Sequence, residues 1–315
     1  EEYEHEVNRF KKGIEQIEYK DYVKKAFVYM NQAFMTQLSP SNRVYSGWRL
    51  FQIVFIVSLI CEMIRSEYKN DRAIAEADIE TANLLYFPTG GGKTEAYLGL
   101  MAFTIANRRL TAKPDDELNK DGGVTVILRY TLRLLTAQQR DRLTKMIIAA
   151  ELIRRKEPQK YGKEPFSIGF WVGGGVTPNK FDDLIDKPSG DHGEVARNRS
   201  MLFKQLPTCP CCGRPLNEKN YYILPEQKSV EIYCSSGKSC IFYRYNSDRF
   251  PIPVYFVDEE IYSKCPTIIL ATVDKFAHLP WGAESNSLFG RVDRKCSRDG
   301  YIAIGSEHPA RHPAT

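Results

Sequence analysis

The chain has 315 residues, of which 43% are apolar and 26% are charged, and its formal net charge is +5. This composition excludes a disordered or fibrous protein, and the length allows one large domain or two small ones around a sizeable core. The longest apolar run, residues 53–61, is too short to cross a bilayer, and no signal peptide is visible, so we expect no membrane association. The eight cysteines lie mostly between positions 209 and 240, which favours metal binding over disulfides in a reducing cytoplasm.

The first 38 residues are predicted to be helical, because apolar residues recur along one side of a mixed-charge sequence. The apolar stripe comprises Val23, Ala26, Phe27, Met30, Ala33 and Phe34. We expect this helix to pack on the core of the protein.

A second, strongly apolar helix is predicted from Trp48 to about Ile64. Its segment Arg49-Leu-Phe-Gln52 resembles the helicase Q-motif, in which the glutamine reads the adenine edge. The alternative for a single glutamine in a helix is ordinary solvation.

The strongest motif in the sequence is residues 84–95, Leu-Leu-Tyr-Phe-Pro-Thr-Gly-Gly-Gly-Lys-Thr-Glu. An apolar run typical of a buried strand leads into three glycines, and a helical pattern follows from Thr94. Strand, glycine loop, Lys-Thr and helix together are the P-loop. The glycines let backbone N–H groups close around phosphate oxygens, Lys93 would reach the β- and γ-phosphates, and the Thr94 hydroxyl would bind Mg²⁺.

The general P-loop pattern has a glycine six residues before the lysine, where this chain has Phe87. The form Pro-Thr-Gly-x-Gly-Lys-Thr resembles that of superfamily 2 helicases and translocases. We predict catalytic roles for Lys93 and Thr94. The predicted ATP-binding residues are Arg49, Gln52, Thr89, Gly90, Gly91, Gly92, Lys93, Thr94 and Glu95. The alternative is a glycine-rich turn that binds no nucleotide.

Another short apolar run, residues 124–128, predicts a buried parallel strand. The following residues, 129–142, resemble helicase motif Ia, in which a threonine at the turn and a helix start bind a nucleic-acid phosphate. We predict DNA contacts for Arg129, Thr131 and Arg133, and a solvated basic helix face is the alternative. The positions expected to face the core are Leu143, Met146, Ile147, Ala150 and Ile153.

A further strand is predicted at residues 166–172, and three glycines follow it. This pattern resembles superfamily 2 proteins, in which a Gly-Gly turn lies close to the backbone of the bound strand. We assign Gly173 and Gly174 to that role, and a plain tight turn is the alternative. Residues 179–200 are polar, contain proline and glycine, and are expected to form a mobile segment.

The cysteine pattern predicts a metal site. In Cys209-Pro-Cys-Cys-Gly213, the Cys-x-x-Cys-Gly turn aims two thiolates at one tetrahedral metal. The predicted ligands of a structural Zn²⁺ are Cys209, Cys212, Cys234 and Cys240, and the metal would hold together a small β-rich insertion. Cys211 lies between two of these and could replace one. Buried cysteines without a metal are the alternative for the whole set.

Two apolar runs lie near the end of the sequence, at residues 253–260 and 266–276. The second resembles motif Ib, a strand followed by Thr-x-x-Lys, and we predict that Thr272 and Lys275 contact DNA. The first ends in Asp-Glu at 258–259 and imitates Walker B, but it precedes motif Ib where Walker B should follow. No apolar strand ending in Asp-Glu comes after Lys275, so we expect these 315 residues to stop short of Walker B.

Several of these stretches together resemble the large helicase subunit of the DISARM bacterial anti-phage systems (the DrmA type). They are residues 26–34, 48–52, 87–94, 128–139 and 271–277, together with the cysteine knuckles. The resemblance covers most of the chain from about residue 24 to 290. It implies an ATP- and Mg²⁺-dependent DNA motor that works with a partner subunit. Such proteins carry two RecA-like domains, so this sequence would supply the first, without Walker B, and we expect it to be inactive alone as an ATP hydrolase.

The predicted fold is α/β: a P-loop RecA-like, doubly wound parallel sheet with an N-terminal helical layer and a zinc-ribbon insertion. We expect a helical region at 1–47, the first part of the RecA-like ATPase domain at 48–200, the insertion at 201–250 and the continuation of the domain at 251–315. The predicted function is that of an ATP-dependent DNA helicase or translocase subunit in cytoplasmic phage defence. The alternative is a zinc-ribbon module that binds nucleic acid or a partner protein and senses nucleotide. A small-molecule P-loop kinase would leave motifs Ia and Ib without a role.

Overall fold

The computed structural model describes residues 2–36, 47–66, 68, 71, 74, 82–88, 90–112, 120–131, 137–186, 191–246, 250–279, 282–296 and 298–306, and the structural statements below concern these residues. By its contacts the chain divides into two compact units. The first comprises residues 1–121 and 152–163, and the second comprises residues 122–151 and 164–315. In the part that the structure describes, no helix is both long enough and apolar enough to cross a bilayer.

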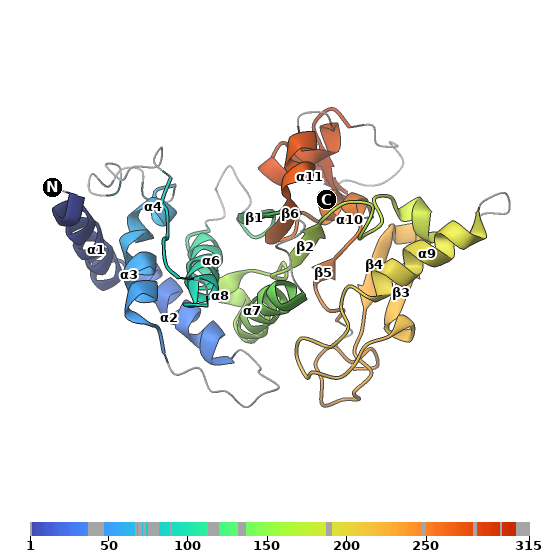
Figure 1. Cartoon of the computed structure of the whole chain (residues 1–315), viewed down its shortest axis with the longest axis horizontal. Helices are drawn as coiled ribbons and strands as arrows, with labels where there is room; N and C mark the ends of the chain where they lie inside the picture. The colour runs from blue at the N-terminus through green and yellow to red at the C-terminus, as the bar shows by residue number, and fades with distance from the viewer. Residues whose placement is uncertain are drawn as a thin grey trace. The chain divides into compact units, whose positions relative to one another are not determined.

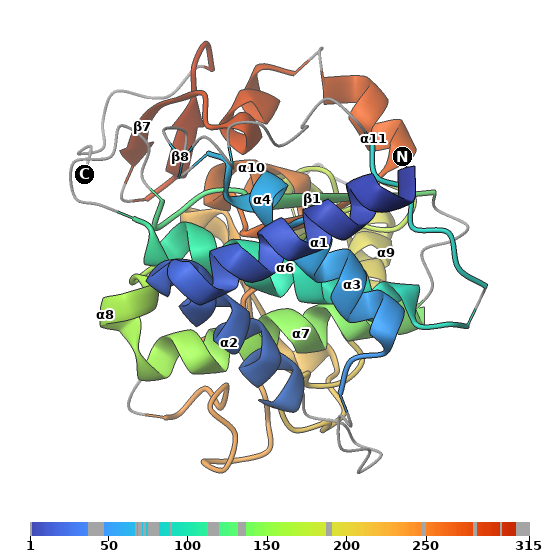
Figure 2. The ribbon, with the colours of Figure 1, turned by 90° about the vertical axis from the view of Figure 1, so that its left-hand side faces the viewer.

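The first unit is helical. Its helices are α1 (Glu2–Tyr19), α2 (Asp21–Thr36), α3 (Leu50–Ser58), α4 (Ile60–Ile64), α6 (Lys93–Leu110) and the short α8 (Pro158–Tyr161). α6 packs against α2 and α3, and α1 packs against α2 and α3 (Figure 2). The predicted apolar stripe is confirmed, since all of its members are buried except Phe27, which is half-buried. The helix predicted over residues 1–38 is in fact two helices that meet at Lys20.

The buried strand predicted at residues 84–87 is not found, so this prediction is wrong. The segment pairs with no strand of the described chain, and Leu84 and Tyr86 are 88% and 90% exposed. The ring of Phe87 stacks on Phe51 of α3, with their centroids 3.9 Å apart. The segment lines a cavity of about 670 Å³ whose other walls come from α1, α3 and α4. A short apolar run is compatible with either placement, because its pattern does not specify what it packs against.

The second unit is organised around a four-stranded parallel sheet with the strand order β1-β6-β2-β5 (Figure 1). The strands are β1 (Val126–Tyr130), β2 (Ile168–Trp171), β5 (Val254–Tyr255) and β6 (Ile268–Thr272). β6 pairs with β1 on one side and β2 on the other, and all of its residues are buried. Its sequence Ile-Ile-Leu-Ala-Thr is almost continuously apolar, as expected of a parallel strand covered on both faces. The predicted α/β class with a parallel sheet is therefore confirmed.

Helices and two hairpins complete the second unit. α7 (Ala137–Lys156) buries its predicted core positions, α10 (Asp258–Lys264) follows β5, and α11 (Val273–His278) follows β6. The antiparallel hairpins are β3 (Tyr221–Leu224) with β4 (Ser229–Ile232), and β7 (Val292–Cys296) with β8 (Gly300–Ala303). The 3₁₀ turns are η1 (Phe181–Leu184), η2 (Glu218–Asn220), η3 (Pro225–Gln227) and η5 (Ala283–Phe289).

Part of the segment predicted as mobile, residues 179–200, belongs to a helix, α9 (His192–Phe203). Asp191 caps this helix, because its Oδ1 accepts the N–H groups of Gly193 and Glu194 at 2.8 and 3.1 Å. The prediction therefore overlooked an N-cap aspartate in front of a mostly polar helix.

Candidate functional site

The predicted phosphate loop leads directly into α6, whose first turn contains Lys93, Thr94 and Glu95. Gly92 is the N-cap residue and has φ +93°, a backbone conformation that residues with a Cβ rarely adopt. The first N–H groups of an α-helix have no partner within the helix, so this turn offers backbone donors at the loop. Thr89 lies outside the described residues.

The residues predicted to form a Q-motif reach this loop from α3. Arg49 Nη1 donates to Gly91 O at 2.6 Å, and Gln52 Nε2 donates to Gly92 O at 2.7 Å. Gln52 is 4% exposed, and its Oε1 accepts the Arg49 N–H at 2.8 Å at the start of the helix. Both side chains therefore hold carbonyl groups of the loop, which the sequence alone did not indicate.

Lys93 is folded onto the chain that enters the loop. Its ammonium donates to Phe87 O and, at 3.3 Å, to Pro88 O. An ammonium has three donors, so Lys93 can exchange or share these carbonyl contacts with a phosphate oxygen.

Residues of three predicted DNA-binding motifs lie at one edge of the parallel sheet, where the strands end. Thr131 directly follows β1 and is exposed, whereas Thr272 ends β6 and is buried. Gly173, after β2, has φ +95°, and a Cβ added to it would lie 3.6 Å from Lys275 Cε. The structure thus brings the Gly-Gly turn and motif Ib together, as carboxyl ends of parallel strands require. Gly174, the next residue, is exposed.

Two arginines are also predicted to contact DNA at this edge. Arg129 lies in β1 with an exposed side chain, and its guanidinium carbon is 5.7 Å from the ring centroid of Phe276 in α11. Arg133 lies outside the described residues.

Lys275 is held in an ion pair that the sequence did not predict. Its Nζ donates to Asp258 Oδ2 at 2.5 Å and to Asn179 Oδ1 at 3.0 Å. The two charged side chains are only 16% and 6% exposed. Burial raises the pKa of Asp258, and the neighbouring Lys275 ammonium opposes that effect. Asp258 was considered as a Walker B acid, but its carboxylate is bound to Lys275 in this structure.

The next two acids of α10 hold other segments of the second unit. Glu259 Oε2 accepts the Phe181 N–H of η1 at 2.8 Å. Glu260 is 1% exposed, and its Oε1 accepts the Ser229 hydroxyl at 2.5 Å and the Val230 N–H of β4 at 3.2 Å. Burial raises the pKa of Glu260 to about 7.

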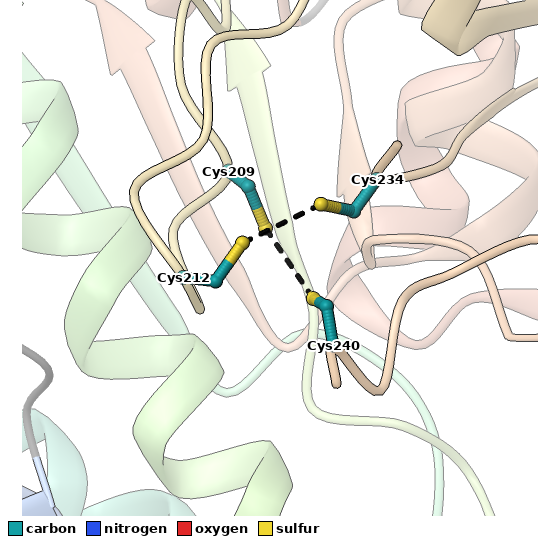
Figure 3. Close-up of side chains that lie close together, drawn as sticks. All are labelled: Cys209, Cys212, Cys234 and Cys240. Atoms are coloured by element: carbon teal, nitrogen blue, oxygen red, sulfur yellow. Dashed lines mark hydrogen bonds between the residues drawn. The ribbon is translucent and has the colours of Figure 1, made fainter. Parts of the chain in front are cut away.

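The four predicted metal ligands converge (Figure 3). The sulfur atoms of Cys209, Cys212, Cys234 and Cys240 all lie within 4.8 Å of one another. Two turns present them. Gly213 N–H donates to Cys209 O at 2.8 Å in the first, and Cys240 N–H donates to Gly237 O at 3.1 Å in the second. All eight cysteines of the chain are free thiols, and Cys211 is not part of the converging set.

The spacing of the sulfurs fits a zinc ion. Four sulfurs at ~2.3 Å from a tetrahedral Zn²⁺ lie about 3.8 Å apart. Cys209 and Cys240 are 3.8 Å apart, and Cys212 and Cys234 are 3.4 Å apart. Thiol hydrogen bonds from Cys209 and then Cys211 lower the pKa of Cys240, whereas the contact with Cys240 raises the pKa of Cys209 and burial raises the pKa of Cys234. The close sulfurs by themselves therefore favour a thiolate at Cys240 and thiols at Cys209 and Cys234.

Comparison with known proteins gives one informative result. No family model matches the chain. The chain is 42% identical over 330 aligned positions to the DISARM protein DrmA of Bacillus paralicheniformis. The alignment covers 97% of this chain, and the chain spans 28% of the length of that relative. The resemblance predicted from the sequence is thereby confirmed: over nearly its whole length, this chain is a relative of DISARM protein DrmA.

Proposed function

We propose that this chain provides the ATP-binding and DNA-contacting parts of an ATP-dependent DNA helicase or translocase in a cytoplasmic anti-phage defence system. The observation that carries the proposal is the contact of Arg49 and Gln52 with Gly91 and Gly92, which joins two segments that the sequence predicts to bind nucleotide, about 40 residues apart. The similarity to a DISARM protein supports the defence role, which includes a partner subunit.

The proposed site divides the chemistry among a few groups. Lys93 and the backbone N–H groups at the start of α6 bind the phosphates, and the Thr94 hydroxyl binds the Mg²⁺ that accompanies ATP. In this proposal the parallel sheet belongs to a RecA-like domain, whose strand ends carry the DNA contacts, and Zn²⁺ on the four cysteines holds the insertion. The proposal keeps the predicted division of the chain into residues 1–47, 48–200, 201–250 and 251–315.

The test is nucleotide binding by this chain. Lys93→Ala should weaken the binding of a fluorescent ATP analogue by roughly tenfold or more, since hydrogen bonds to charged groups contribute about 1.5–3 kcal/mol. Lys25→Ala is the matched control, because Lys25 is a lysine of the same unit that pairs only with Asp21 and the ring of Tyr22 in the described contacts. Equal affinities for all three proteins, with folding intact, would refute the ATP site.

A second function is favoured by the state of the acids at the sheet edge. Asp258 is bound to Lys275 and Glu259 to Phe181, so neither is placed to activate water. Within the described residues this leaves the sheet edge without a water-activating acid, as in a zinc-ribbon module that binds nucleic acid or a partner protein and senses nucleotide. DNA-stimulated ATP turnover would favour the motor, and ATP binding without turnover would favour the module.

A further inference from the structure

We propose that Asp258 masks Lys275, so that this carboxylate limits the affinity of the sheet edge for nucleic acid. The inference rests on the proposed function, because it concerns the same DNA-contacting edge. The inference gives Asp258, which lies outside the predicted DNA-binding motifs, a role in nucleic-acid affinity. It also changes what is expected of Lys275 in motif Ib, because Asp258 neutralises its charge.

Lys275 and Asp258 lie at the ends of two different strands of the sheet and form a close ion pair. Lys275 is the third residue of α11, beyond the end of β6, and Asp258 begins α10, beyond the end of β5. Their charged atoms are 2.5 Å apart, and the aspartate side chain is 6% exposed. The pair therefore has no net charge at the point where a phosphate contact from motif Ib is predicted.

The remaining contacts of the ammonium strengthen this conclusion. Asn179 Oδ1 accepts a second hydrogen bond from Lys275 at 3.0 Å, so two of its three donors are used. Gly173 lies directly against the lysine stem, as the 3.6 Å Cβ approach indicates. A phosphate oxygen at the Gly-Gly turn would therefore meet the lysine with its charge already neutralised by Asp258.

The energetic consequence follows from salt-dependent binding. When a lysine neutralises a phosphate, it releases counterions that were condensed on the nucleic acid. A lysine whose charge is already neutralised by a carboxylate releases fewer of these counterions. Replacing Asp258 with asparagine keeps the size of the side chain and an oxygen acceptor but removes the competing charge. It should convert Lys275 into a cation available to phosphate.

The experiment measures the binding of a labelled single-stranded oligonucleotide of mixed sequence across a range of salt concentrations. Asp258→Asn should raise the affinity roughly tenfold and steepen the slope of log affinity against log salt by about 0.7, one single-strand phosphate contact. Adding Lys275→Met to Asp258→Asn should abolish both gains. Glu259→Gln is the matched control, because it removes the same charge from the same helix turn and its carboxylate contacts Phe181 rather than Lys275.

The outcomes are distinct. An unchanged or reduced affinity in folded Asp258→Asn, with measurable binding by the unaltered chain, would overturn the masking role. An equal gain in Glu259→Gln would also overturn it, since net charge alone would then explain the effect. Absence of binding in every variant would instead overturn the proposed DNA-contacting edge, and the masking role with it.

Discussion

The cysteine cluster gives the sharpest test of a single side chain. Cys212 is exposed, so replacing its sulfur with oxygen removes a proposed metal ligand with little disturbance of packing. We expect the unaltered chain to hold one Zn²⁺, Cys212→Ser to hold almost none, and Cys211→Ser to retain it. Cys211 is the matched control because it is adjacent in sequence but not part of the converging set.

The expected loss of stability follows from the small size of the structure around the cysteine cluster. A two-stranded hairpin such as β3–β4 is marginally stable by itself in water. Structural Zn²⁺ binds cysteine-rich peptides with an apparent free energy of about 10–16 kcal/mol at pH 7. If even a fraction of this stabilises residues 205–250, loss of the metal should unfold that segment while the four-stranded sheet remains folded.

The assay combines metal analysis with hydrogen exchange. Zinc content is measured on purified protein after removal of loosely bound metal, and amide exchange is followed separately in β4 and β6. Faster exchange in β4 with protection retained in β6 is expected for Cys212→Ser and for chelator-treated protein. Full zinc content in Cys212→Ser, zinc loss in Cys211→Ser, or equally fast exchange in both strands would refute the reasoning.

Three further predictions concern other sites. Gln52→Ala should lower ATP affinity and narrow the preference for ATP over GTP, as measured by competition; unchanged affinity would show that its hydrogen bond to Gly92 does not support the loop. Arg133→Ala should reduce the salt slope of single-strand binding by roughly 0.7 without changing ATP affinity, and an unchanged slope would leave it a solvated charge. Glu260→Gln should stabilise the protein at pH 8 by up to about 3 kcal/mol, because the pKa of Glu260 is raised to about 7 and its charged form is disfavoured by burial. A variant that is no more stable than the unaltered chain at pH 8 would contradict the burial argument.

Much of the second unit could be predicted because its signals are local. The continuous apolar runs at β1, β2 and β6 are typical of parallel strands, and the glycine after β2 marks a turn that only a residue without Cβ adopts easily. The turn that brings Cys209 and Cys212 close together was likewise predictable, since the Cys-x-x-Cys-Gly spacing fixes the geometry of its own turn.

Contacts between distant segments could not be predicted in this way. Residues 84–87 have the composition of a strand, but their neighbours are α1, α3 and α4, and only tertiary packing decides this. The pairing of Lys275 with Asp258 joins two helices that follow different strands, and the sheet order that makes them neighbours is not written in either segment. Asp258 was visible as an acid after an apolar run that imitates Walker B, but nothing in that run indicated a lysine partner.

The raised pKa of Glu260 connects the cysteine centre to the sheet edge in a measurable way. Its carboxylate accepts hydrogen bonds from Ser229 and Val230, which belong to the hairpin that the metal is proposed to hold. A folded-state pKa of about 7, above the ordinary value of 4.5, means that the native protein binds the extra proton between these pH values. Stability is therefore greatest below about pH 4.5 for this group and falls as the pH rises toward 7.

If metal loss releases the hairpin, Glu260 gains water and its pKa should return toward the ordinary range. The part of the pH dependence that arises between about pH 4.5 and 7 should then disappear from chelator-treated protein, as it should from Glu260→Gln with metal bound. Denaturant unfolding of both proteins at pH 5 and pH 8 measures this difference. A pH dependence that survives chelation but is abolished by Glu260→Gln would show that Glu260 stays buried without the metal, and that α10 rather than the zinc centre holds the hairpin in place.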